Sequence, residues 1–162
     1  MDPQEITEEL EHPGARNLLA GATLLRLAYN GSDGFPRVIP IGFHWTGNEI
    51  VVCTAASAPK VKALSSRPHV AITIDVGDTP TEARTLLMRG LARVDIVDGV
   101  PDEFLAASTK ALPADQVAEF GRQVRSMYDQ MARISIEPLW ARFFDFGAGR
   151  MPSFLTKLAG EA

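Results

Sequence analysis

The chain has 162 residues, of which 46% are hydrophobic and 22% charged, a balance typical of one globular domain. Its formal net charge of −4 argues against non-specific binding to nucleic acid, which needs a basic surface. Its one cysteine excludes an intrachain disulfide, and no apolar run approaches the roughly 20 residues that cross a bilayer. The first residues lack the pattern of a signal peptide, so we expect a single cytoplasmic domain over residues 1–162, with no membrane partner.

Short apolar stretches alternate with turn-forming residues over much of the chain. Residues 3–20 predict a lead-in with a short helix over residues 15–20. Strands are predicted over residues 22–29, 35–45, 49–54, 69–76 and 84–97, and a helix over residues 59–67. Too few residues separate the first three strands for a parallel crossover, so these strands should pair antiparallel.

The periodicity changes after residue 100. Apolar side chains then recur three or four positions apart, at Val117, Phe120, Val124, Met127 and Met131. Pro113 should divide this segment into two helices. Strands return over residues 132–136 and 139–146, interrupted by Pro138, before a tail over residues 147–162 with a weakly helical end. We therefore predict a mainly β fold, in which about six or seven antiparallel strands form a closed or partly closed barrel with helices.

The most informative part of the chain is the connection between the third predicted strand and the helix that follows it. Ser57 is a good N-cap residue, and Pro59 is tolerated in a first helical turn because its missing N–H is no loss there. A helix start presents unpaired N–H groups and the positive end of its dipole. The Thr54 hydroxyl and the Lys60 and Lys62 ammonium groups would converge there, which predicts a phosphate-binding site. An ordinary connection with solvated lysines is the alternative.

Three motifs resemble those of the pyridoxamine 5'-phosphate oxidase-like family of flavin-binding split barrels, over roughly residues 22–146. Residues 54–70 are similar to the family's T-x(4–5)-x-K…L…x-P-x-V pattern. Residues 34–40, Gly-Phe-Pro-Arg-Val-Ile-Pro, look like its G-x-P-x-x-x-P strand, and residues 89–92, Arg-Gly-Leu-Ala, look like its x-G-x-A. Each motif is weak alone, but the three together, in this order and spacing, are fairly specific.

The resemblance implies an antiparallel split β-barrel, here with an inserted helical segment near residues 101–131. It also implies a flavin cofactor and a homodimer in which both chains build each cofactor site. Arg37 to Ile41 would line one wall of that site. Together with the phosphate-binding segment, the resemblance predicts these cofactor-binding residues: Arg37, Val38, Ile39, Pro40, Cys53, Thr54, Ser57, Pro59, Lys60, Lys62, Thr85 and Trp140.

Two positions depart from the family's pattern. Many members have an arginine before the phosphate lysine, where this chain has Pro59, and a glutamine against the flavin ring, where it has Thr85. These differences argue against pyridoxamine phosphate oxidation itself. A branch of the superfamily uses the deazaflavin coenzyme F-420, whose phosphate and polyglutamate tail Lys60, Lys62 and Arg67 would suit. The sequence leaves FMN and coenzyme F-420 both open as cofactors.

The remaining residues of chemical interest predict no separate site. Cys53 reads as a buried structural thiol. The three histidines lack metal-ligand spacing, so no metal is predicted: His12, His44 and His69. Four aromatic residues near the C-terminus are predicted to pack in the core or at an interface, or to contact a flavin: Trp140, Phe143, Phe144 and Phe146.

The leading hypothesis for function is an FMN- or coenzyme F-420-dependent oxidoreductase that transfers hydride to or from a small organic substrate. No catalytic residue is predicted, because the cofactor carries this chemistry. The alternative is a non-catalytic flavin, deazaflavin or haem carrier of the same fold, with His44 or His69 as the candidate haem ligand. The apolar helical stripe after residue 116 either roofs the substrate pocket or packs on the barrel.

Overall fold

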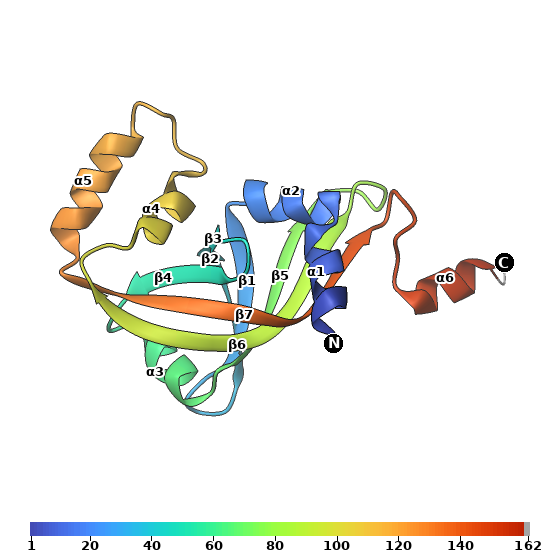
Figure 1. Cartoon of the computed structure of the whole chain (residues 1–162), viewed down its shortest axis with the longest axis horizontal. Helices are drawn as coiled ribbons and strands as arrows, with labels where there is room; N and C mark the ends of the chain where they lie inside the picture. Colours follow the sequence, from blue (N-terminus) through green and yellow to red (C-terminus); the bar gives the residue numbers. More distant parts are fainter. Residues whose placement is uncertain (161–162) are drawn as a thin grey trace.

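The computed structural model describes residues 1–160 and contains a strongly curved, antiparallel seven-stranded sheet (Figure 1). Residues 161 and 162, the end of the predicted tail, lie outside the described residues. The strands are β1 (Leu24–Asn30), β2 (Pro36–Gly42), β3 (His44–Trp45), β4 (Ile50–Ala55), β5 (His69–Val76), β6 (Arg84–Asp98) and β7 (Gln130–Asp145). Their order in the sheet is β2-β1-β5-β6-β7-β4-β3.

The two end strands of this sheet are consecutive along the chain. β2 pairs with β1, and after Phe43 the chain continues as β3, which pairs with β4. The predicted strand over residues 35–45 is therefore divided at Phe43, whose side chain is fully buried in the core. β2 and β4 are not hydrogen-bonded neighbours, so the barrel is split along this line. The predicted antiparallel split barrel is confirmed.

Pro138 does not interrupt the last strand, contrary to the sequence-based prediction. β7 is continuous, and its register with β6 shifts, so that Gly90 pairs with Pro138 while Arg89 pairs with Trp140. Leu139 is the extra residue of a β-bulge, the feature that lets a proline sit inside a strand. Gly90 permits the close approach, because a Cβ there would lie 2.2 Å from the Glu137 carbonyl oxygen.

Residues 1–160 form six helices, and none of these is long and apolar enough to cross a membrane. They are α1 (Pro3–Glu11), α2 (Pro13–Gly21), α3 (Pro59–Ser66), α4 (Asp102–Thr109), α5 (Val117–Met127) and α6 (Ser153–Gly160). Two helices, α1 and α2, thus occupy residues 3–21, where the sequence predicted only one short helix over residues 15–20. The signal for α1 is a capping box: Asp2 accepts from the Gln4 N–H at 2.8 Å, and Glu5 accepts from the Asp2 N–H at 3.2 Å.

A buried carboxylate fastens α1 to β7. Glu9 is 6% exposed and accepts hydrogen bonds from Arg142 and from the Phe143 N–H, each at 2.8 Å, and from Arg150 at 2.7 Å. Burial acts to raise the pKa of Glu9, but these three donors outweigh it and hold the pKa below its usual value. The N-terminal helix is therefore joined to the barrel through an ionised group.

The helical insertion forms two helices on either side of Pro113, as predicted. α4 packs against β2, β3 and β4, whereas α5 stands away from the sheet (Figure 1). Val124 is buried, but Val117 and Met127 are exposed and Met131 belongs to β7. The predicted stripe therefore does not cover the barrel as one apolar face.

Lys110 anchors the insertion just after α4. Its ammonium donates to the Ala22 carbonyl at 3.1 Å, at the end of α2, and lies 3.9 Å from the centre of the Phe43 ring. Burial lowers the pKa of this lysine. The insertion is thus tied to α2 and to the residue at which β2 becomes β3, which fixes α4 over the split of the barrel.

Candidate functional site

A cavity of about 690 Å³ opens where the barrel is split, between β2, β4, the start of α3 and the helical insertion. It brings together seven of the residues predicted to bind a cofactor, with six others. Its lining residues are Tyr29, Arg37, Ile39, Pro40, Ile41, Cys53, Thr54, Ala55, Pro59, Lys60, Phe104, Tyr128 and Met131.

The local sequence at the end of β4 determines where α3 begins. Pro59 is the first helical residue, and the N-cap is Ala58, with φ −63° and ψ 137° and no side-chain cap. A proline forces the residue before it into an extended conformation, which is also the conformation of an N-cap. The prediction that Ser57 caps this helix is therefore wrong. The Ser57 side chain is exposed and does not line the cavity.

Lys60 supplies a positive charge at this end of the cavity. Its ammonium is half-buried and donates to the Thr54 hydroxyl at 3.1 Å, and burial lowers its pKa. Lys62 does not join it: residues two apart lie on different sides of a helix, and Lys62 is exposed outside the cavity. Of the two predicted lysines, only Lys60 lines the cavity.

Two arginines near the cavity are already engaged with the β1–β2 turn. Arg37 lines the cavity and pairs with Asp33 at 2.8 Å. Arg67, at the C-terminal end of α3, donates to the Gly31 carbonyl at 3.2 Å and does not line the cavity. Arg37 therefore lines the cavity rim as one half of an ion pair, whereas Arg67 braces the turn beside it.

The cavity also has an apolar wall. Cys53 and Met131 are buried on β4 and β7, and Phe104 and Tyr128 of the insertion pack against them. The two aromatic rings meet edge to face, with centroids 6.5 Å apart and an interplanar angle of 62°. Neither Phe104 nor Tyr128 was predicted as a site residue, because no local pattern links them to the strand-to-helix connection, which lies far earlier in the sequence.

An ion pair holds this wall in place. Arg133 of β7 contacts Glu103 of α4, with N–O distances of 2.9 and 2.8 Å. The Cys53 thiol lies close by, and its pKa is raised to about 12 by burial and by the Glu103 carboxylate, against the opposing effect of Arg133. Cys53 is therefore a protonated thiol that packs, in keeping with a structural role.

Besides Ser57 and Lys62, three more predicted site residues lie outside this cavity: Val38, Thr85 and Trp140. Cross-strand pairing puts a row of residues on the outer face of the sheet: Val38, Ala28, Ala71, Arg89 and Trp140. Thr85 is on the same face of β6, four residues before Arg89, whose guanidinium carbon lies 4.3 Å from the centre of the Trp140 ring. Within one chain these residues face away from the barrel interior.

No family model matches this chain, and no curated protein sequence is significantly similar to it. Solved structures do match. An F420 reductase is 25% identical and matches 78% of this chain and 94% of its own length, with a TM-score of 0.58. A candidate pyridoxamine 5'-phosphate oxidase from Listeria innocua is 18% identical over 80% of this chain and 94% of its own, with a TM-score of 0.54.

A haem storage protein from Vibrio cholerae has the same fold. It is 18% identical and matches 85% of this chain and 94% of its own length, with a TM-score of 0.57. The chain therefore has the fold of the pyridoxamine 5'-phosphate oxidase-like split barrels, as its sequence motifs predicted. Proteins of this fold serve different chemistries, so the function must be argued from the site.

Proposed function

We propose that this split-barrel protein binds a flavin-type cofactor, FMN or coenzyme F-420, in the cavity at the start of α3 and uses it for hydride transfer. The observation that carries the proposal is the combination of a cationic and an aromatic lining in one cavity. Lys60 and the first turn of α3 form one part of the lining, and Phe104 and Tyr128 form another. A flavin has an anionic phosphate at one end and a planar, largely apolar ring at the other, so the two match.

The phosphate end would use groups that are already positioned. The Thr54 hydroxyl and the Lys60 ammonium are in contact, and the free N–H groups of the α3 start lie beside them. Burial lowers the pKa of Lys60, and an anion beside it would stabilise the charged form. A charge-assisted contact of this kind is about twice as strong as a neutral hydrogen bond.

The ring end would use packing and exclusion of water. The cofactor supplies the hydride chemistry when bound, and the protein contributes binding and orientation. Cys53 is a protonated thiol and Met131 is buried, so the ring would meet apolar groups. The insertion, through Phe104 and Tyr128, would cover the ring on one side of the cavity.

Coenzyme F-420 is the first cofactor to test. The F420 reductase matches nearly all of its own length to this chain, and Pro59 and Thr85 replace the arginine and glutamine that many FMN-binding members use. The outward orientation of Lys62 weakens the argument from a second lysine. FMN therefore stays in the proposal as the alternative.

We also propose that the chain forms a homodimer that completes the site. Several large apolar side chains are exposed: Leu24 (54%), Phe35 (71%) and Val38 (65%). Trp140 and Thr85 lie on the outer face of the sheet, where they would contact a cofactor only if it is held by a second copy. A dimer would cover the apolar residues and give the predicted contacts a role.

The alternative function is that of a carrier without turnover, which the haem storage protein of the same fold exemplifies. Haem requires an axial ligand, and neither His44 nor His69 lines the cavity. This observation favours a flavin-type cofactor over a haem that is held by either histidine.

Titration of the apo-protein with FMN and with coenzyme F-420, followed by cofactor fluorescence, tests the proposal. We expect saturable binding of at least one cofactor, followed by turnover with a panel of quinones, enones and nitro compounds. Tight binding with no turnover across the panel would support the carrier function. A lack of binding by both cofactors would refute the site.

A further inference from the structure

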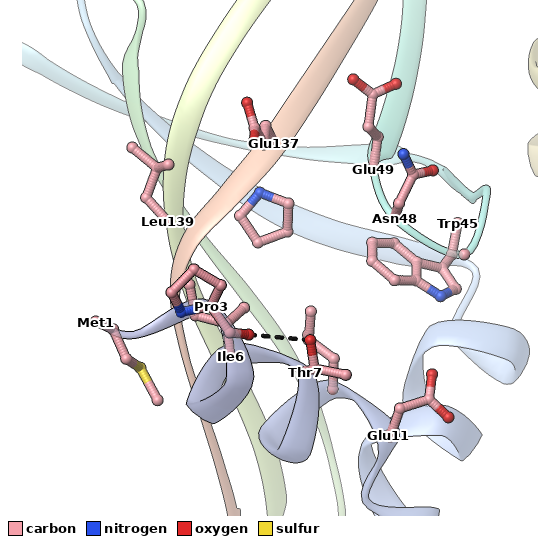
Figure 2. Close-up of a pocket in the computed structure, with 13 residues that line it drawn as sticks. Met1, Pro3, Ile6, Thr7, Glu11, Trp45, Asn48, Glu49, Glu137 and Leu139 are labelled. Atoms are coloured by element: carbon pink, nitrogen blue, oxygen red, sulfur yellow. Dashed lines mark hydrogen bonds between the residues drawn. The ribbon is translucent and has the colours of Figure 1, made fainter.

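A second cavity, of about 560 Å³, lies between α1, the β3–β4 turn and the β-bulge of β7 (Figure 2). It shares no lining residue with the cavity at the start of α3. Three consecutive residues of β7, Glu137, Pro138 and Leu139, line it. In a regular strand successive side chains point to opposite faces, so the bulge is what aims this segment at one cavity.

The charged side chains that line this cavity are all negative. Glu11, Glu49 and Glu137 line it, and no lysine or arginine does. Glu11 is partly neutralised by Arg16 at 3.5 Å, whereas Glu49 and Glu137 form no ion pair within residues 1–160. Glu49 and Glu137 also border one adjoining hollow, and Figure 2 shows both carboxylates on the side of the cavity away from α1.

The neighbouring cations do not neutralise these two carboxylates. Arg93 borders the adjoining hollow, but its guanidinium pairs with Asp95 at 3.4 Å. The α-amino group of Met1, another lining residue, makes no ion pair in the part of the chain that the structure describes. Glu49 and Glu137 thus carry negative charge that no cation within residues 1–160 pairs with, and this charge is available to a ligand in the cavity.

The rest of the lining is largely apolar and includes one aromatic platform. Trp45 on β3 is half-buried, and Ile6 and Leu10 of α1 and Leu139 of β7 complete the apolar surface (Figure 2). The face of an indole ring attracts cations and packs against flat apolar groups. Carboxylates beside an indole therefore suit a molecule that carries both a positive charge and an apolar body.

We infer that this cavity is a binding site for an organic cation, a protonated amine or quaternary ammonium on an apolar skeleton. The ammonium group lies at Glu49 and Glu137, and the apolar part lies on Trp45 and Leu139. The same carboxylates repel phosphate, which separates this site from the cofactor cavity. The inference does not depend on a flavin, so it is tested on the protein without one.

Trp45 reports directly on the site. The chain has two tryptophans, so a Trp140→Phe background leaves Trp45 as the single emitter. Its fluorescence is followed during titration with 2-phenylethylammonium, with the neutral 2-phenylethanol and with the anionic 3-phenylpropionate, and calorimetry on the same samples measures each affinity independently. We expect the cation to bind about tenfold more tightly than the alcohol, since two carboxylates and a cation–π contact each contribute modestly.

The double variant Glu49→Gln/Glu137→Gln keeps the shape of the cavity and removes its charge. It should lower the affinity for the cation about tenfold and leave that for the alcohol unchanged, whereas Glu8→Gln, on α1 outside the cavity, should change neither. Unchanged affinity for the alcohol also shows that the variant is folded. Equal binding of cation and alcohol, an unchanged cation affinity in the double variant, or no binding of the cation by either method would overturn the inference.

Discussion

The Lys60 ammonium lies 3.1 Å from the Thr54 hydroxyl, across the turn that joins β4 to α3. They are six positions apart in the sequence, and the intervening turn is short because the Ala58 N–H bonds to the Ala55 carbonyl at 3.0 Å. The contact places a partly desolvated cation beside the first turn of a helix, where N–H groups are free. This pair is the centre of the proposed phosphate site.

Lys60→Ala should weaken binding of the flavin-type cofactor by about 1.5–3 kcal/mol, roughly tenfold to a hundredfold, because a charge-assisted contact to phosphate is lost. Lys62→Ala is the matched control, since Lys62 lies on the same helix but is exposed outside the cavity. Fluorescence titration of both variants measures the difference. Equal affinities for the two variants would remove the α3 start from the site.

The wild-type protein should behave as a homodimer in light scattering at micromolar concentration. Val38→Glu should shift it toward monomer, because Val38 is 65% exposed on the outer face of the sheet and a buried charge there is unfavourable. Met127→Glu, at a position 69% exposed on α5, is the control and should leave the mass unchanged. A monomeric wild-type mass would contradict both the dimer and the role proposed for Trp140.

Glu9→Gln should destabilise the protein at pH 7 by about 1.5–3 kcal/mol, because its hydrogen bonds to Arg142 and Arg150 lose their charge. The folded-state pKa of Glu9 is below the usual value of 4.5, so its contribution is complete above that pH and is lost as the pH falls further. The difference from wild type in urea denaturation should therefore shrink in acid. Glu8→Gln, exposed on the same helix, should change stability by less than about 0.5 kcal/mol.

The Cys53 thiol should resist alkylation in the native protein. Burial and the nearby Glu103 raise its pKa to about 12, and the thiolate is the reactive form. Iodoacetamide at pH 8 should modify the chain readily in denaturant and hardly at all under native conditions, as mass spectrometry would show. Native modification at the rate of a free thiol would mean that the apolar wall of the cofactor cavity opens to solvent.

The sequence was informative wherever the determining interactions are local. The periodicities gave six of the strands and the two helices of the insertion, and Pro59 alone fixed the start of α3. The capping box of Asp2 and Glu5 was also readable, although α1 was not predicted from it. Such signals span three to eight residues, the distance over which a helix turn or strand alternation acts.

The register of the sheet determined which face each strand residue occupies, and local sequence patterns do not contain this information. It turned Val38 and Trp140 to the outer face, and it let β7 continue through Pro138 because Gly90 stands opposite. A strand repeats every two residues, so one step of register changes which face a side chain occupies. The predicted set of site residues was therefore divided between a cavity and an outer surface by pairing that the motifs do not specify.

By itself the sequence determined an antiparallel, mainly β barrel with a lysine and a hydroxyl at the start of a helix, since these follow from periodicity and from a seven-residue segment, and its motifs resembled those of split barrels. Only the tertiary structure brought Phe104 and Tyr128 to a wall of that cavity and Glu9 to Arg150 across the chain. It also assembled the acidic cavity around Trp45. Contacts between distant segments depend on how strands pair and helices dock, which is a property of the whole fold rather than of any one segment.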